Sequence, residues 1–241
     1  MSNIKVREAF ALATDRSAYV TAVGGSAVAT ATNSLINPAL PAFPNTPLPA
    51  GEKGDQAKAK QMLTDAGLTL PVKITVAYRK SATADKVFAG LKAGWDAAGF
   101  DVQLDGFSAK YYSTIQSIEA SAKYDAMWAG WGADYPSAST VIPPLLDSRI
   151  NISSGGAGQD YGWFDDKDAN SKMDEINKIA DMAKREKAWG DLDTEIVTKK
   201  FGIIPLIVDK FVFVHGSNVV GAVVNGTYTG YYDLATVSVK S

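Results

Sequence analysis

The stretch Tyr124–Leu146 reads YDAMWAGWGADYPSASTVIPPLL, and the rest of the chain is interpreted outward from it. A short apolar run that ends in Gly and Pro is typical of a buried strand that stops at a turn. Asp134 therefore lies just past the end of the predicted strand. Because open α/β sheets bind ligands beyond the carboxyl ends of their strands, this position favours a binding role.

Four side chains of this stretch are candidates for ligand binding: Asp134, Trp131, Trp128 and Tyr135. A carboxylate among aromatic rings can hold a cationic group by an ion pair and by cation–π attraction of about 0.5 to 2 kcal/mol. In the alternative interpretation, the tryptophans fill the core and Asp134 caps a helix that begins near Ser137. Spacing alone does not decide between the two.

Helical and strand patterns alternate on the amino side of this stretch. The predicted helices begin at residues that can cap them, and the predicted strands alternate apolar and polar residues. The helices are expected over residues 55–66, 81–99 and 108–121, and the strands over residues 71–78 and 101–107. Alternation of this length predicts βαβ units and a largely parallel sheet, with Asp134 beyond its third strand.

The first 54 residues divide into a helical part and an irregular part. Apolar residues at helical spacing predict one helix over residues 6–20. Arg7 and Arg16 are expected on its solvent side or in ion pairs with neighbouring acids. Residues 31–54 are rich in closely spaced prolines, which exclude regular helix or central strand and predict a loop across the surface.

Beyond Leu146 the chain first becomes polar and then periodic. The Gly-rich residues 151–162 predict a mobile surface loop, and the acids of residues 165–170 are expected at the amino end of a helix. Apolar stripes and β-branched runs then predict two helices, over residues 169–183 and 185–200, and two strands, over residues 203–214 and 219–224.

Composition argues against several classes of function. The chain has no cysteine and one histidine, His215, so disulfides and thiolate catalysis are excluded, and a multi-histidine metal site or a Ser-His-Asp triad is disfavoured. We expect no cofactor and no metal. A formal net charge of −2, from 24 basic and 26 acidic residues, gives no general attraction to nucleic acid.

Four motifs follow one another in an order that is itself informative. One is the pair Tyr124-Asp125 with Gly130–Pro136, and the others are Val6–Arg16, Asp55–Gly67 and Ile204–Ile207. Together they resemble the peptide and oligopeptide solute-binding proteins that serve ABC importers, extracellular solute-binding protein family 5. Each motif is weak alone, and their common order and spacing make the resemblance fairly specific.

The resemblance implies a fold and a domain organisation. The chain would be a periplasmic-binding-protein-like α/β lobe, with a mainly parallel sheet flanked by helices. Residues 1–203 would form the ligand-binding lobe. Residues 204–241 would form hinge-return strands and a tail that packs on a missing amino-terminal lobe. The chain would then be the carboxy-terminal lobe of a longer, secreted protein, with residues 1–3 as a leader added for expression.

The resemblance also implies a function. The protein would capture a peptide or similar small solute in a cleft between lobes and deliver it to ABC transporter permease subunits. It would lie outside the cytoplasm, in the periplasm or anchored by lipid at the outer face of the membrane. Asp134 would correspond to the carboxylate that pairs with a ligand's amino terminus. Two departures leave the solute open, since Ser137 stands where the family often has Asp and Trp128 where some members carry a basic residue.

Two other classes of function remain as alternatives. One is a glycoside hydrolase or other hydrolase that uses acidic cleft residues, for which Asp125 and Asp134 are the nearest pair. These two would lie roughly 30 Å apart along an extended chain, which argues against a shared site. The other class is a non-catalytic interaction domain whose aromatic residues are all core. The receptor interpretation predicts that the protein is not an enzyme.

Overall fold

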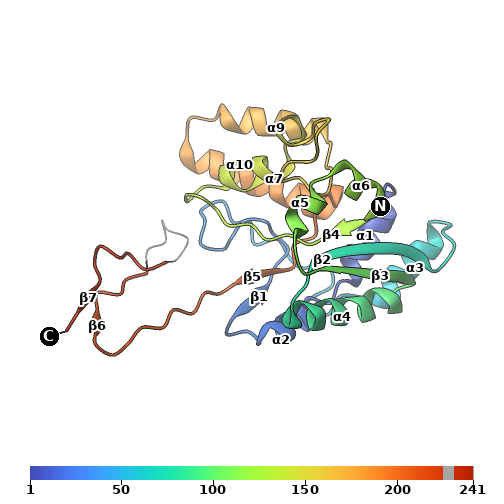
Figure 1. Cartoon of the computed structure of the whole chain (residues 1–241). Helices are drawn as coiled ribbons and strands as arrows, with labels where there is room; N and C mark the ends of the chain where they lie inside the picture. The colour runs from blue at the N-terminus through green and yellow to red at the C-terminus, as the bar shows by residue number, and fades with distance from the viewer. Residues whose placement is uncertain (225–230, 241) are drawn as a thin grey trace.

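A three-stranded parallel sheet is the centre of the computed structural model, which describes residues 1–224 and 231–240 (Figure 1). The strands lie in the order β3 (Phe100–Phe107), β2 (Val72–Arg79) and β4 (Ala126–Met127). Both pairings are parallel, which confirms the predicted sheet. β4 is short, because the chain leaves the sheet at Trp128. The main-chain N–H of Trp128 still donates to Ala77 O of β2 at 2.9 Å.

Helices α3 (Gln56–Asp65) and α4 (Ala82–Ala97) begin where the sequence predicts. Asp55 caps α3, and Ser81 caps α4 by accepting a hydrogen bond from the first turn. The face of α4 that packs toward the sheet repeats every four residues, at Val87, Leu91 and Trp95. Burial of each such side chain stabilises the fold by about 1.5 to 3 kcal/mol.

The single helix predicted over residues 6–20 is two helices, α1 (Ile4–Ala13) and α2 (Arg16–Val23). The prediction is wrong because Thr14 leaves the helical conformation, and the Asp15 carboxylate then accepts a hydrogen bond from the first turn of α2. Apolar spacing continues across this break, whereas the cap starts a new helix.

Two arginines of these helices bind main-chain carbonyls of the segment that follows residue 200. Arg16 is fully buried, and its Nε donates to Pro205 O at 2.8 Å and to Thr32 O at 3.1 Å. Burial lowers the pKa of Arg16 to about 10. Arg7 Nε donates to Phe201 O at 3.1 Å. The expectation that both arginines face solvent or pair with neighbouring acids is therefore wrong, because main-chain carbonyls of distant segments take their hydrogen bonds.

A second core joins the proline-rich loop to the helices of the carboxyl half. These helices are η1 (Ala138–Thr140), α7 (Ile142–Leu146), α8 (Ser148–Asn151), α9 (Lys167–Asn177) and α10 (Met182–Glu195). Ile36 and Ala42 of the loop are buried together with Trp189 of α10. The loop approaches so closely that a Cβ at Gly190 would lie 2.5 Å from Ala42 O. The segment predicted to cross the surface thus contributes to a core.

Helices α5 (Tyr111–Ile115) and α6 (Ile118–Lys123) replace the single helix predicted between β3 and β4. The helix breaks because Ser117 caps α6 with its side chain. The Gly-rich loop docks at this break, where Ala157 N donates to Gln116 O at 2.9 Å and Ala157 is fully buried. The loop that composition predicts to be mobile is therefore held by main-chain contacts.

The chain then returns toward its first helices. The π-helical turn η2 (Ile196–Lys200) continues α10, and β5 (Ile207–Asp209) pairs antiparallel with β1 (Ala29–Ala31). These contacts join the last part of the body to residues near its beginning.

Beyond β5 an extended arm leaves the body (Figure 1). It ends in the antiparallel pair of β6 (Val219–Val220) and β7 (Ser238–Val239). The strands predicted after residue 203 are therefore much longer than those observed, because most of the arm has no neighbouring strand to bond with. Residues 225–230 and 241 of the predicted return strands and tail lie outside the described residues.

Candidate functional site

A cleft of about 1360 Å³ contains most of the predicted site. Its walls are formed mainly by residues 124–133, 159–166 and 199–209. Trp128, Trp131 and Tyr135, three of the four residues predicted to bind a ligand, line it. Asp134 is exposed and does not line the cleft itself, although its neighbours Ala133 and Tyr135 do. The carboxylate therefore stands at the rim.

Trp128 is fixed where the chain leaves the sheet. Its Nε1 donates to the Tyr19 hydroxyl at 3.3 Å, and Trp128 O accepts a hydrogen bond from the Tyr111 hydroxyl at 2.6 Å. Burial raises the pKa of Tyr111, so this phenol remains a donor at neutral pH. The indole is half-buried between two hydrophobic clusters, so it both fills the core and reaches the cleft.

Residues 131–140, called the aromatic loop from here on, present the other three predicted side chains. Trp131 is 41% exposed and Tyr135 is 54% exposed, so neither fills the core. Asp134 caps no helix, because Ser137 caps η1. Within the described part of the chain, the Asp134 carboxylate has no hydrogen bond or ion pair, while its main-chain N–H donates to Thr140 Oγ1 at 3.1 Å. The core-and-cap interpretation of these three residues is therefore wrong.

A second wall of the cleft, Gln159–Asp166, was missed by sequence reasoning. Asp160 is buried, and its Oδ2 accepts a hydrogen bond from Phe164 N at 2.8 Å. Burial raises the pKa of Asp160 to about 6. The bend places Trp163 in the left-handed region, at φ 53°. The available signal was the aromatic run Tyr161–Phe164 directly after the glycines.

The acidic residues of the segment 165–170 lie at the start of a helix, as predicted. Asp166 caps α9 by accepting a hydrogen bond from Ala169 N at 2.9 Å. Lys200 is the last residue of η2. Its Nζ lies 2.9 Å from Oδ2 of Asp166 and 2.9 Å from Oδ2 of Asp168. The charge of these two carboxylates is therefore compensated by the Lys200 ammonium group.

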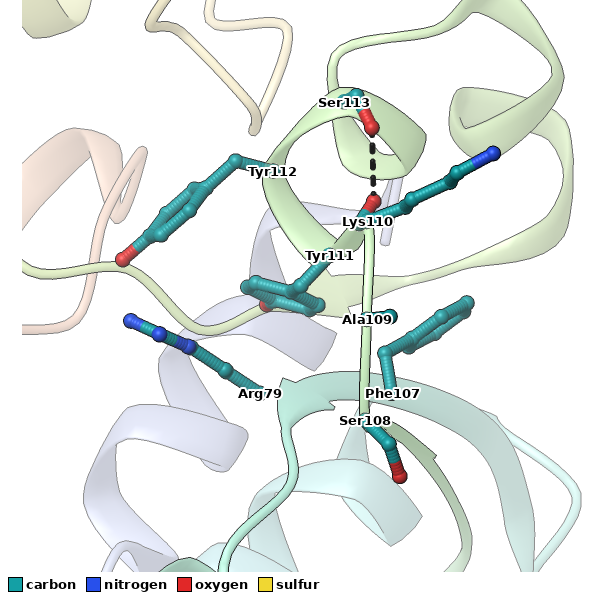
Figure 2. A pocket seen from close by; sticks show the side chains of 8 residues that line it. All are labelled: Arg79, Phe107, Ser108, Ala109, Lys110, Tyr111, Tyr112 and Ser113. Carbon is teal, nitrogen blue, oxygen red and sulfur yellow. Dashed lines mark hydrogen bonds between the residues drawn. The ribbon is translucent and has the colours of Figure 1, made fainter.

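A smaller pocket of about 290 Å³ lies where β2 and β3 end at one edge of the sheet (Figure 2). Arg79 is the last residue of β2. Figure 2 shows the side chains of Arg79 and Tyr112 reaching toward the same side, whereas Lys110 points away. Among the residues that the structure describes, none forms an ion pair or hydrogen bond with the Arg79 guanidinium.

This Arg79 pocket adjoins the cleft. Tyr111, which lines this pocket, donates its hydroxyl to Trp128 O at 2.6 Å, and Trp128 lines the cleft. The ring centroid of Tyr112 lies 5.9 Å from that of Tyr161, which also lines the cleft. Sequence reasoning missed Arg79, although the basic pair Arg79-Lys80 directly follows a predicted strand.

Asp125, considered as a hydrolytic partner of Asp134, is engaged within the sheet. Its Oδ2 accepts a hydrogen bond from Thr75 N at 2.9 Å on the neighbouring strand. Asp125 therefore serves as an acceptor for the sheet, and among the described residues its carboxylate makes no hydrogen bond with Asp134.

The family of the chain follows from its match to a known group of proteins. The model described as bacterial extracellular solute-binding proteins, family 5 Middle, matches residues 1–152. The chain belongs to this family. The periplasmic oligopeptide-binding protein OppA of Haemophilus influenzae is 28% identical over 218 residues, which are 85% of this chain and 37% of that protein. The resemblance inferred from the four motifs is confirmed.

Solved structures show the same fold. The clavulanic acid biosynthesis oligopeptide binding protein 2 superposes on this family 5 chain with a TM-score of 0.88 at 24% identity, covering 99% of this chain and 44% of that one. The Escherichia coli murein tripeptide binding protein MppA gives 0.78 at 18% identity, covering 100% and 46%. OppA of H. influenzae in complex with RPPGFSPFR gives 0.69 at 22% identity, covering 99% and 46%. The predicted periplasmic-binding-protein fold is confirmed.

The chain spans less than half the length of these relatives. The matched family is extracellular and the OppA relative is periplasmic. Within the described ranges, no helix combines the length and apolar character needed to cross a membrane.

Proposed function

We propose that this family 5 chain is the carboxy-terminal ligand-binding part of an ABC importer receptor that captures a short peptide. The observation that carries the proposal is the Asp134 carboxylate at the rim of an aromatic cleft, which has no hydrogen-bond or ion-pair partner among the residues that the structure describes. A peptide's ammonium group would gain a charge-assisted hydrogen bond there and contact the exposed rings of Trp131 and Tyr135. The relatives named for oligopeptides and a tripeptide support this class of ligand.

Arg79 supports a ligand with a negative group as well. A guanidinium without a protein partner can bind a carboxylate through two parallel hydrogen bonds, and the Tyr112 hydroxyl can donate a third. A free peptide carries an ammonium group at one end and a carboxylate at the other. We propose that Asp134 and Arg79 bind these two ends, so that short peptides with free termini are preferred.

The remaining parts of the proposal concern the whole receptor. Residues 1–203 would form one lobe, and residues 204–241 would return through a hinge to an amino-terminal lobe that completes the cleft. The receptor would act outside the cytoplasm and deliver its ligand to permease subunits. In this proposal the protein binds its ligand without turnover, so the hydrolase alternative is set aside.

The test is calorimetric titration of the receptor, with its amino-terminal lobe present, against trialanine. N-acetyl-trialanine, trialanine amide and maltose serve as comparison ligands. We expect trialanine to bind, the acetylated peptide to lose affinity in the same measure as Asp134→Asn, and the amide in the same measure as Arg79→Gln. Binding of maltose alone, or equal binding of all three peptides, would contradict the proposal.

A further inference from the structure

The aromatic loop is tied together by its own hydrogen bonds. Thr140 O accepts a hydrogen bond from Trp131 Nε1 at 2.8 Å, and Thr140 Oγ1 accepts one from Asp134 N at 3.1 Å. Thr140 Oγ1 in turn donates to Ser137 O at 3.2 Å. Through Thr140, the orientations of Trp131 and Asp134 depend on the position of the turn that begins at Ser137.

Tyr135 is connected to the same turn. Its hydroxyl lies 3.1 Å from Ser139 Oγ, which donates to Ser137 Oγ at 3.1 Å. Ser137 Oγ then donates to Glu186 Oε1 on α10 at 2.9 Å. Among the described residues, this is the one side-chain hydrogen bond that joins the aromatic loop to another part of the chain.

Glu186 is an unusual residue for its position in the helix. It is 6% exposed, and within the described part of the chain its Oε2 has no hydrogen-bond partner. No ion pair to it is present in that part either. Burying a carboxylate without a cation costs free energy, and an apolar side chain of similar size would be at least as stable there. Stability of α10 therefore does not explain a glutamate at this site.

We propose that Glu186 is a positioning residue for ligand binding. It acts through Ser137, and it holds the aromatic loop in the orientation that turns the rings of Trp131 and Tyr135 into the cleft and places Asp134 at its rim. Ala138 and Thr140 of η1 are buried, whereas residues 131–137 are exposed or half-buried, so that a single charge-assisted hydrogen bond to a helix of the core orients this exposed part of the loop.

The pair also accounts for the residue at position 137. An aspartate at this position would bring a second carboxylate toward that of Glu186. Two like charges at hydrogen-bond distance repel, whereas a serine hydroxyl donates. Ser137 and Glu186 are thus chemically matched to each other.

The positioning role is tested by hydrogen exchange in the chain itself, without a ligand. Glu186→Met removes the acceptor at similar volume, and Glu186→Gln keeps an acceptor oxygen. We expect exchange at the Trp131 indole N–H and the Asp134 amide to become about tenfold faster in Glu186→Met and to change less than about threefold in Glu186→Gln. The thermal midpoint of Glu186→Met should stay the same or rise. Glu175→Met, on an exposed face of α9, is the matched control and should change neither quantity.

Two results would overturn the inference. One is unchanged exchange in Glu186→Met. The other is faster exchange throughout the protein together with a lower thermal midpoint, which is the behaviour of a residue that only supports the fold. If Glu186→Met does not fold, Glu186→Leu removes the same acceptor with another apolar side chain of similar size and should give the same local change in exchange.

The binding part of the inference rests on the proposed peptide function. In the receptor with both lobes, Glu186→Met should weaken trialanine binding by about tenfold and Glu186→Gln should retain it. Equal affinity of Glu186→Met and the unchanged receptor would refute a role in binding. If the unchanged receptor binds no trialanine, the peptide function fails, and the exchange measurement still decides whether Glu186 positions the loop.

Discussion

Arg16 joins two segments that are far apart in the sequence, one at Thr32 and one at Pro205. Its guanidinium is fully buried and donates to the main-chain carbonyls of Thr32 and Pro205. Arg16→Met would leave both carbonyls without these donors, so we expect the free energy of unfolding to fall by about 3 kcal/mol, measured by urea denaturation. The same change at the exposed Arg79 should alter it by less than about 0.5 kcal/mol. Similar values for both variants would show that the carbonyls find other donors.

Asp193 on α10 should make stability depend on pH. Its Oδ1 accepts a hydrogen bond from Leu35 N at 2.9 Å, and burial raises its pKa from 3.8 to about 6. Between about pH 4 and pH 6 the unfolded chain has released this proton while the folded protein keeps it. The free energy of unfolding therefore falls as the pH rises through this window, by up to roughly 3 kcal/mol, and stays constant above it.

Asp193→Asn removes this contribution. The difference in unfolding free energy between the variant and the unchanged protein should grow from pH 4 to pH 6 in favour of the variant, as measured by denaturation at a series of pH values. Asp191→Asn, which removes an exposed carboxylate of the same helix, is the control and should show no such trend. A pH-independent difference for Asp193→Asn would contradict the assignment.

At the scale of elements, the contact between α10 and the proline-rich loop makes glycine more favourable than alanine at one position of the helix. Alanine in a helix is usually favoured over glycine by about 0.5 to 1 kcal/mol. At Gly190 the new Cβ would lie 2.5 Å from Ala42 O, so the loop or the helix must move. We expect Gly190→Ala to lower the free energy of unfolding by about 1 to 3 kcal/mol. A stabilised variant would mean that the loop does not rest on α10.

An element could be predicted from the sequence where the residues that determine it lie close together along the chain. The starts of α3 and α4 were predictable because Asp55 and Ser81 cap within their own first turns. The parallel sheet was predictable from alternation along the chain. The second wall of the cleft, Gln159–Asp166, was not predicted, because the glycines before it indicate a mobile loop. Nothing in the sequence marks Asp160, which shapes this wall, as buried.

The candidate site was predictable in part for the same reason. The exposed rings of Trp131 and Tyr135 belong to one short motif that points to a ligand. Arg16 was placed wrongly because its partner carbonyls lie far away in the sequence, and Glu186 was not singled out because Ser137 meets it only in the folded chain. Pairs that come together through folding are the part that a single sequence does not indicate.

For the whole molecule, the arm beyond β5 adds little to either core. Its side chains are largely exposed, with Phe211 at 64%, Val214 at 86% and Leu234 at 80%. We expect a chain that ends after Lys210 to keep its thermal midpoint within about 3 °C, because the body keeps its buried contacts. Sedimentation velocity should also show less self-association, since exposed apolar surface promotes it. A large drop in the midpoint would show that the arm supports the body.

The arginine contacts have a consequence for the order in which the protein can be completed during synthesis. The carbonyls of residues 201 and 205 emerge from the ribosome nearly 200 residues after Arg7 and Arg16, which bind them. Until then a ribosome-bound chain exposes a guanidinium group meant for its interior, and β1 lacks its partner strand. Closing so long a loop costs conformational entropy before any contact repays it, so the final fold must form late and slowly. Over these nearly 200 residues of synthesis, we expect the nascent chain to stay open and accessible to chaperones.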